Sequence, residues 1–165
     1  VIVAAAAIAS VIALVSYFIP ILPSINSVGR KSLGTLFYAL SIGILAAWFW
    51  QDQPQYTVIG ILVMAWGDGM AAIIGQRFGK HTYRIFDITK SWEGSLTMAI
   101  VTFIVTSIIL GLVEGINWQI GIISLIVALV ATILEAFSKL GIDNFTVPLA
   151  SALCSFFYIH YLFIL

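Results

Sequence analysis

The sequence contains little charge. Only 8% of its residues are charged, 62% are hydrophobic, and the mean hydropathy is +1.14, whereas soluble domains carry roughly 25% charged residues. This deficit excludes an ordinary water-soluble domain and predicts an integral membrane protein. The net charge of zero, without a basic face interleaved with aromatic residues, also argues against a nucleic-acid partner.

Cysteine and the common nucleotide-binding motifs are scarce as well. Cys154 is the single cysteine, so an internal disulfide is impossible, and its apolar surroundings predict an inert buried thiol. The sequence has neither a G-x-x-x-x-G-K-[ST] phosphate loop nor a G-x-G-x-x-G dinucleotide motif. Any nucleotide is therefore expected on a different scaffold.

Long apolar runs dominate the rest of the chain. A bilayer core about 30 Å thick requires around 20 apolar residues per helix. These runs are uninterrupted, unlike the alternating segments of a transmembrane β-barrel. They predict an all-α, polytopic transmembrane helical bundle with about six spans: 1–19, 34–50, 57–75, 95–113, 119–136 and 146–165. We interpret residues 1–165 as one integral membrane domain, with a truncated or processed start because Val1 already lies in an apolar run.

The basic residues all fall on one side of this predicted bundle. If the spans alternate in direction, the connections 20–33, 76–94 and 137–145 lie together, and they contain every Lys and Arg: Arg30, Lys31, Arg77, Lys80, Arg84, Lys90 and Lys139. The positive-inside rule places this side in the cytoplasm. Topology alone explains the bases, but it does not require the acids Asp87, Glu93 and Asp143 on the same side.

Two carboxylates, Asp68 and Glu135, lie within predicted spans and toward the basic side. The stretch "MAWGDGMAAIIGQRFGK" places Asp68 between two glycines, about nine residues before Arg77, or roughly 13 Å along a helix. A carboxylate at this depth costs a few kcal/mol on insertion scales and is expected to face a polar interior. Function is the default hypothesis, and an aspartate that only joins two helices is the structural alternative. The flanking glycines predict a loosened turn.

Glycines and bases cluster shortly after Asp68. The segments "GQRFGKH" and "TKSWEGS" belong to the longest connection. This combination of residues suits a polyphosphate with Mg²⁺. Acids can hold the metal, bases can neutralise phosphate oxygens, and glycines permit close approach. The spacing alone is weak support, and the same bases suit anionic lipids. Simple helix packing is the alternative explanation for the glycines.

A second acidic segment follows the fifth span. In "LEAFSKLGIDNFTVPLASAL", Glu135 ends a span and Asp143 and Asn144 occupy the turn before the next helix, shortly before Pro148. An Asp-Asn pair is also an ordinary helix cap, so capping and ligand contact are equal alternatives for Asn144. For Glu135 and Asp143 we favour function, because both lie toward the face that holds Asp68.

Four ordered blocks together resemble a known family. "GRKSLGT", "AWGDGMAAIIGQRFGKH", "TKSWEGSLTMAI" and "LEAFSKLGIDNFTVPLASAL" are similar to the polyprenol kinase family, and most similar to its phytol kinase members. The resemblance covers nearly the whole chain from Gly29 onward. It implies a multispanning enzyme of a cyanobacterial or plastid membrane that uses CTP or UTP with Mg²⁺. Such an enzyme phosphorylates the terminal hydroxyl of an isoprenoid alcohol such as phytol, a step toward tocopherol.

The resemblance also implies roles for individual residues. Catalysis is expected at Asp68, Lys90 and Asp143, and metal binding at Asp68 with Asp143 or Glu135. Asp68 is alternatively the base that accepts the alcohol proton. The residues expected to bind the nucleotide are Arg30, Lys31, Gly75, Arg77, Gly79, Lys80, Glu93, Gly94 and Asn144. Relatives often carry a histidine after the early Arg-Lys pair, which "RKSLGT" lacks.

Other functions remain as alternatives. Within lipid chemistry, the acceptor can be diacylglycerol or dolichol, or the reaction can be cytidylyl transfer. A transporter is the alternative from a different class, because embedded acids and interrupted helices also mark ion pathways. Against transport, the ionisable residues gather at one face and do not step across the membrane. A purely structural subunit leaves the four charged blocks unexplained.

Overall fold

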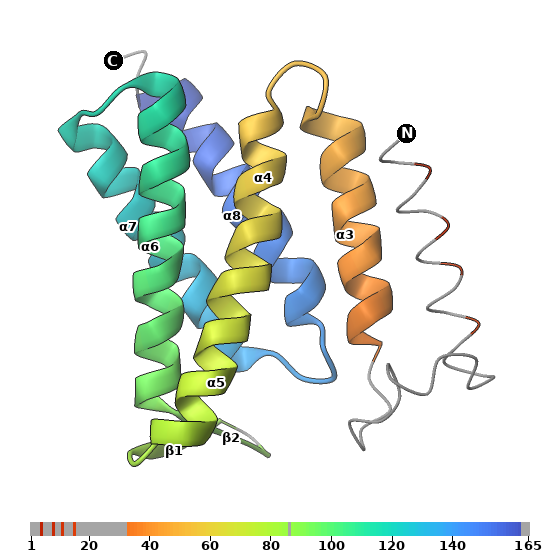
Figure 1. The fold of residues 1–165 in the computed structure, drawn as a ribbon, viewed down its shortest axis with the longest axis vertical. Coiled ribbons are helices and arrows are strands. Elements are labelled where there is room, and N and C mark those ends of the chain that lie inside the picture. Colours follow the sequence, from red (N-terminus) through yellow and green to blue (C-terminus); the bar gives the residue numbers. More distant parts are fainter. Residues whose placement is uncertain are drawn as a thin grey trace.

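The computed structural model describes residues 33–85 and 87–162, together with residues 4, 8, 11 and 15. The predicted span 1–19 lies almost entirely outside the described residues, and Arg30 and Lys31 lie outside them. The described chain is a helical bundle with one small hairpin (Figure 1). Its elements are α3 (Gly34–Phe49), α4 (Pro54–Leu62), η1 (Val63–Asp68), α5 (Gly69–Phe78), β1 (Thr82–Ile85), β2 (Ile88–Ser91), α6 (Trp92–Glu114), α7 (Trp118–Phe137) and α8 (Asp143–Leu162).

The prediction of an all-α membrane protein is confirmed. Three helical segments are long and apolar enough to cross a membrane: Pro54–Phe78, Trp92–Glu114 and Trp118–Phe137. The helix Gly34–Phe49 is apolar but shorter. Helix α8 covers most of the last predicted span, 146–165, but it is not one of the three segments suited to cross a membrane. The number of about six spans therefore stays a prediction.

The segment Pro54–Phe78 is one continuous helical path with a change in its middle. Pro54 starts α4 at a position where a missing N–H does no harm. Residues Val63–Asp68 then adopt π-helix η1, and the α-helix resumes at Gly69. Short π-helical segments inside α-helices are frequent at functional sites. The wider turn ends at Asp68, where the sequence predicted a loosened turn.

The long predicted connection 76–94 is largely ordered. Helix α5 extends to Phe78, and the antiparallel strands β1 and β2 pair Tyr83 with Lys90 before α6 begins at Trp92. The side chain of Ser91 caps α6 by accepting a hydrogen bond from the Gly94 N–H at 3.1 Å. Sequence reasoning did not predict this hairpin, which forms one wall of the site described below.

Helix α8 tolerates a proline because another helix supplies the missing donor. Pro148 has no N–H to donate to the Asn144 carbonyl one turn earlier. The Ser41 hydroxyl of α3 lies 3.1 Å from that carbonyl oxygen and shares its proton with the Tyr38 carbonyl oxygen, which is 2.8 Å away. The turn that leads into α8 uses left-handed backbone at Leu140 (φ 57°) and Gly141 (φ 83°).

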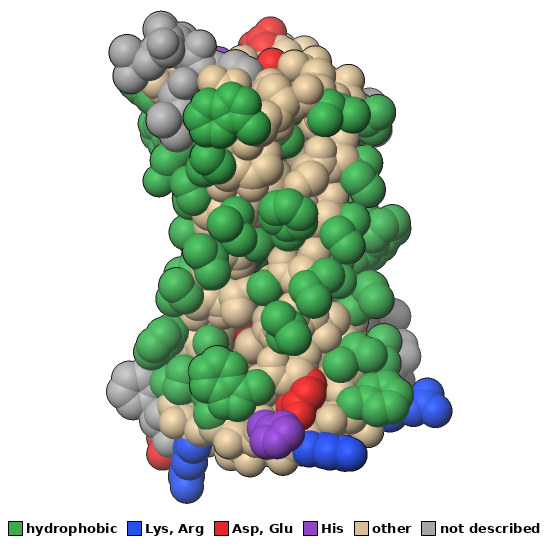
Figure 2. Space-filling model, turned by 90° about the vertical axis from the view of Figure 1, so that its left-hand side faces the viewer, with side chains coloured by type: hydrophobic (Ala, Val, Ile, Leu, Met, Phe, Trp, Pro, Cys, Tyr) green, Lys and Arg blue, Asp and Glu red, His purple; other side chains and the backbone are tan. Residues whose placement is uncertain are grey.

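The core lies between α4, α6, α7 and α8. Helix α6 packs against α5 and α7, and α8 packs against α3, α4 and α7. Fully buried side chains at the centre include Tyr56, Ile59, Met98, Val127 and Val147. Figure 2 shows apolar side chains covering the flank of the bundle, with Lys and Arg at the end that carries the hairpin and acidic side chains at both ends. This distribution suits a bundle that crosses a membrane.

Candidate functional site

A cavity of about 390 Å³ lies at the basic end of the bundle. Four parts of the chain form its walls: the junction of η1 and α5, the hairpin, the start of α6 and the end of α7. The lining residues are Asp68, Ala71, Ala72, Gly75, Gln76, Thr82, Thr89, Lys90, Ser91, Gly94, Ser95 and Glu135. The structure thus brings together five predicted site residues: Asp68, Gly75, Lys90, Gly94 and Glu135.

Asp68 is the acidic residue that the helical segment Pro54–Phe78 contributes to the cavity. It is the last residue of η1 and is partly buried. Glu135 of α7 and Lys90 of β2 line the same cavity. Two acids, from η1 and α7, therefore lie in the wall of one cavity at the basic end of the bundle. This concentration of negative charge favours binding of a cation there.

Lys90 and Glu135 form a largely buried ion pair. The ammonium group of Lys90 donates to the Oε1 atom of Glu135 and, at 2.9 Å, to the main-chain carbonyl of the same residue. The side chains are only 20% and 7% exposed. The pair joins strand β2 to the last turns of α7, and it places the ammonium group in the cavity wall.

Asp143 and Asn144 lie in the first turn of α8 and do not line this cavity. The N–H of Asp143 donates to the Ser138 hydroxyl at 2.6 Å, and the N–H of Asn144 donates to Asp143 Oδ1 at 3.0 Å. The Asn144 side chain donates to the Gly141 carbonyl at 3.3 Å. This donated bond is not the accepted bond of a helix N-cap, so capping and ligand contact stay equal alternatives for Asn144. The predicted role of Asp143 as a metal ligand stays a prediction.

The glycines of the site permit close packing of backbone. A Cβ atom at Gly75 would lie 2.9 Å from the Ser91 hydroxyl, and one at Gly94 would lie 3.0 Å from the Ala71 carbonyl oxygen. A Cβ atom at Gly79 would lie 2.2 Å from the Gly75 carbonyl oxygen. These glycines let α5, α6 and β2 approach each other, as the packing alternative expected. That the same glycines also contact a nucleotide stays a prediction.

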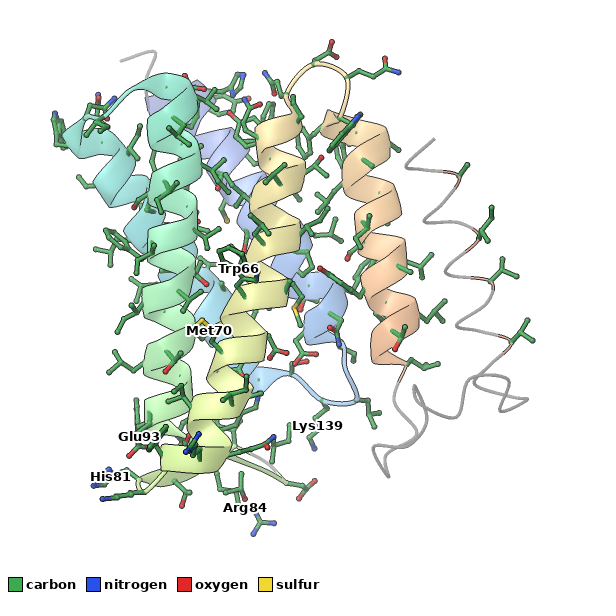
Figure 3. All side chains as sticks on the ribbon, viewed as in Figure 1. Trp66, Met70, His81, Arg84, Glu93 and Lys139 are labelled. Atoms are coloured by element: carbon green, nitrogen blue, oxygen red, sulfur yellow. The ribbon has the colours of Figure 1, made fainter. Side chains whose placement is uncertain are left out.

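Glu93 holds the loop that precedes the hairpin. Its carboxylate accepts hydrogen bonds from the backbone N–H groups of Lys80 and His81, both at 3.2 Å, and contacts the His81 ring nitrogen at 2.8 Å. Figure 3 shows His81 and Glu93 together at the hairpin end. Glu93 does not line the cavity. Its observed contacts position Gly79 and Lys80 next to β2.

Arg77 and Lys80 are exposed at the same end of the bundle and do not line the cavity. The Arg77 guanidinium lies 5.5 Å from the centre of the Phe78 ring. Their predicted contacts with phosphate groups therefore stay predictions. The same is true of Arg30 and Lys31, which lie outside the described residues.

Sequence reasoning missed the hydroxyl groups of the cavity. Ser91 and Ser95 line it, and the Tyr83 hydroxyl contacts the Ser95 hydroxyl at 2.5 Å. Thr82, Thr89 and Gln76 add further polar groups. The signal was present in "TKSWEGS", where two serines flank the start of a helix. Only the packing of the hairpin, α5 and α6, however, directs these residues to the same cavity as Asp68.

The polar cavity provides carboxylates that fit a magnesium ion. Mg²⁺ is commonly held by one or two carboxylates together with substrate phosphates, and both Asp68 and Glu135 line the cavity. The buried Oε2 atom of Glu135 has no hydrogen-bond partner among the described residues. Within the described part of the chain, no group of three His, Cys, Asp or Glu side chains can hold a metal. Phosphate oxygens would therefore have to complete the coordination.

A second, apolar cavity lies at the turn between α7 and α8. Its volume is about 460 Å³, and it is lined by Leu134, Phe137, Ser138, Lys139, Ile142 and Thr146. Leu134 and Glu135 are neighbours in the last turns of α7, so this helix end contributes to both cavities. Lys139 contacts Asp87 of the hairpin turn at 3.1 Å, which connects the apolar cavity to the hairpin.

Comparison with known proteins gives a consistent set of relatives. The chain is 54% identical over 143 residues to a phytol kinase of Synechocystis, a match that covers 86% of this chain and 61% of the relative. The chain is homologous to phytol kinases. A probable chloroplastic phytol kinase of wheat is 34% identical over 131 residues, and phytol kinase 1 of Arabidopsis, also chloroplastic, is 33% identical over 132.

The phytol kinase relatives are longer than this chain. The matches to the two plant proteins cover 74% of this chain but only 43% and 42% of the relatives. No family model and no solved structure matches the chain. The similarity to phytol kinases expected from the four sequence blocks is confirmed.

Proposed function

We propose that this protein phosphorylates the terminal hydroxyl of a long-chain isoprenoid alcohol, most specifically phytol, with CTP or UTP as the phosphate donor. The observation that carries the proposal is the cavity in which Asp68 and Lys90 meet at the basic end of an apolar bundle. Its location allows a nucleotide to arrive from water and a lipid alcohol to arrive from the membrane. The 54% identity to the Synechocystis phytol kinase supports the choice of phytol.

The reaction requires an attack by the alcohol on the γ-phosphorus of the nucleotide. A new O–P bond forms, the bond from the γ-phosphorus to the bridging oxygen breaks, and the nucleoside diphosphate leaves with that bond's electron pair. Asp68 either accepts the hydroxyl proton or helps to hold the metal. Lys90 neutralises charge on the phosphate oxygens, and the Ser91 and Ser95 hydroxyls can donate to them.

A bound Mg²⁺ would neutralise charge on the phosphates, held by Asp68 with Glu135 or Asp143. Exposed Arg77 and Lys80 lie at the same end of the bundle, where they can attract an anionic nucleotide. We place this face in the cytoplasm or stroma of a cyanobacterial or plastid membrane, because the positive-inside rule retains Lys and Arg there. The names of the chloroplastic and cyanobacterial relatives support this location.

We assign the apolar cavity at the α7–α8 turn to the isoprenoid tail. The end of α7 contributes Leu134 to this cavity and Glu135 to the polar cavity, and the lining of the assigned cavity is mainly apolar. A tail in this cavity leaves the hydroxyl end free to reach the acids. Burial of the tail's methyl and methylene groups supplies the binding free energy.

Replacing Phe137 with Ala tests the assignment of the tail. Loss of the ring removes apolar contact area, so we expect the KM for phytol to rise roughly 10-fold, with the KM for the nucleotide unchanged. Phe157→Ala is the matched control, because Phe157 is exposed to a similar extent (50% against 56%) but does not line the cavity. Equal effects of the two variants on phytol would contradict the assignment.

A radiochemical assay tests the proposed function itself. The protein in membranes is incubated with γ-labelled CTP, UTP or ATP and with phytol, dolichol or diacylglycerol, and the lipids are separated by thin-layer chromatography. We expect label in phytyl phosphate, with CTP or UTP as the donor. Label only in phosphatidate identifies a diacylglycerol kinase, and transfer of label only from α-labelled CTP identifies cytidylyl transfer. Asp68-dependent ion flux in liposomes without nucleotide consumption identifies a transporter.

A further inference from the structure

Lys90 is held by two acceptors that belong to the same residue. Its ammonium group donates to the Glu135 carboxylate and to the Glu135 main-chain carbonyl. Lys90 belongs to β2 and Glu135 to α7, so the residues are 45 positions apart in sequence. A lysine side chain has several rotatable bonds and needs such contacts to keep one position. The two acceptors therefore fix where the ammonium group lies in the cavity wall.

Because the ion pair is largely buried, the free energy of each charge depends on the presence of the other charge. Both side chains are largely buried, and removal of one partner from a buried ion pair leaves the other charge uncompensated. The Glu135 carbonyl also lies in the last turn of α7, where the helix dipole favours a cation. Lys90 thus stabilises the end of α7, and Glu135 holds the hairpin against the bundle.

We propose that Glu135 is a positioning residue that directs the Lys90 ammonium group toward the nucleotide's phosphates. This inference rests on the proposed function, in which Lys90 neutralises those phosphates. It assigns Glu135 a role distinct from that of a metal ligand. The carboxylate acts through Lys90, and its loss displaces the charge that binds phosphate even when no metal is present.

A second ion pair between the hairpin and the bundle provides the control. Asp87 in the hairpin turn contacts Lys139 after α7 at 3.1 Å, but the side chains are 84% and 42% exposed. Exposed pairs contribute little to stability because water and salt screen them. Asp87→Asn therefore removes the negative charge from a second ion pair that also joins the hairpin to the rest of the bundle. It leaves the buried pair of Lys90 and Glu135 unchanged.

The first experiment measures the coupling by thermal unfolding of the full chain in detergent. We expect Lys90→Met and Glu135→Met each to lower the unfolding midpoint, and the double variant to regain much of the loss. Asp87→Asn should leave the midpoint close to that of the wild type. Independent losses that simply add in the double variant would overturn the coupling of the two residues.

The second experiment measures binding of a fluorescent CTP analogue in the presence of EDTA. Glu135→Gln keeps the size and the main-chain carbonyl but removes the charge. We expect it and Lys90→Met each to weaken binding about 10-fold, the double variant to bind no worse than Lys90→Met, and Asp87→Asn to bind like the wild type. An unchanged affinity for Glu135→Gln in EDTA, with a higher Mg²⁺ requirement for activity, would identify a metal ligand and overturn the positioning role.

The two experiments separate failure of this inference from failure of the proposed function. If the wild-type protein binds no CTP, UTP or ATP and phosphorylates no lipid alcohol, the proposed function fails. If Lys90 and Glu135 are nevertheless coupled in thermal unfolding, their ion pair has only a structural role. The proposed positioning role of Glu135 is then wrong together with the proposed function. If the protein is a kinase but Glu135→Gln changes neither stability nor EDTA-resistant binding, only the present inference fails.

Discussion

Replacing Asp68 with Asn is expected to abolish phosphorylation of phytol while leaving the bundle folded. Asparagine matches aspartate in size but neither accepts the hydroxyl proton nor provides a negative charge for a metal. Loss of a general base or of a comparable electrostatic contribution lowers rates by roughly 10²- to 10⁴-fold. The measurement is transfer of label from CTP to phytol, with helicity and thermal unfolding followed on the same preparation.

The fold is expected to survive because asparagine matches aspartate in size and is neutral. A neutral side chain costs less to bury than a carboxylate at this partly buried position. The control is Asp52→Asn, which removes an exposed acid at the opposite end of the bundle and is expected to retain full activity. Near-normal turnover of Asp68→Asn would remove Asp68 from the mechanism, and its unfolding would favour the alternative of an aspartate that joins two helices.

Replacing Gly79 with Ala is the second change with a large expected effect. The added Cβ atom would lie 2.2 Å from the Gly75 carbonyl oxygen and 2.8 Å from the Ser91 Cβ atom. Neither neighbour can withdraw easily, because one is helix backbone and the other starts α6. Overpacking of this kind destabilises by about 1–3 kcal/mol, and a shift of about 1 Å in catalytic groups lowers rates about 100-fold.

The measurement for Gly79→Ala is turnover together with thermal unfolding in detergent. We expect the hairpin to move away from α5, which carries Lys90 and Ser91 out of position. Gly121→Ala is the matched control, because a Cβ atom at Gly121 meets no atom within 4 Å, and it should retain wild-type stability and activity. Wild-type behaviour of Gly79→Ala would contradict a steric requirement for glycine at this position.

The membrane helices were predictable because their signal is local. Each requires an apolar run of sufficient length, and the runs 57–75, 95–113 and 119–136 fall within the three helical segments suited to a membrane. The hairpin was not predictable in the same way. Strands of four residues carry little periodicity, and the pairing of Tyr83 with Lys90 depends on how α5 and α6 hold their ends.

The candidate site was predictable in part. Asp68 and Glu135 were selected because charges are costly inside a membrane span, and Lys90 because bases in the connection 76–94 suit phosphate oxygens. The structure brings all three to one cavity. Their relationship was not predictable, since the ion pair of Lys90 with Glu135 depends on the distance between two elements far apart in sequence. For the same reason, the hydroxyl groups of Ser91 and Ser95 were missed.

The sequence by itself determined that this protein is a helical membrane protein, which end carries the bases, and which relatives it resembles. Hydropathy, charge and motif order are properties of the chain and need no contacts between distant residues. Tertiary structure alone decided that Asp68 and Lys90 share a cavity, that Glu93 holds the loop at His81, and that the Asn144 side chain donates to the Gly141 carbonyl. Those assignments depend on side-chain directions and on helix packing, which short-range sequence patterns do not encode.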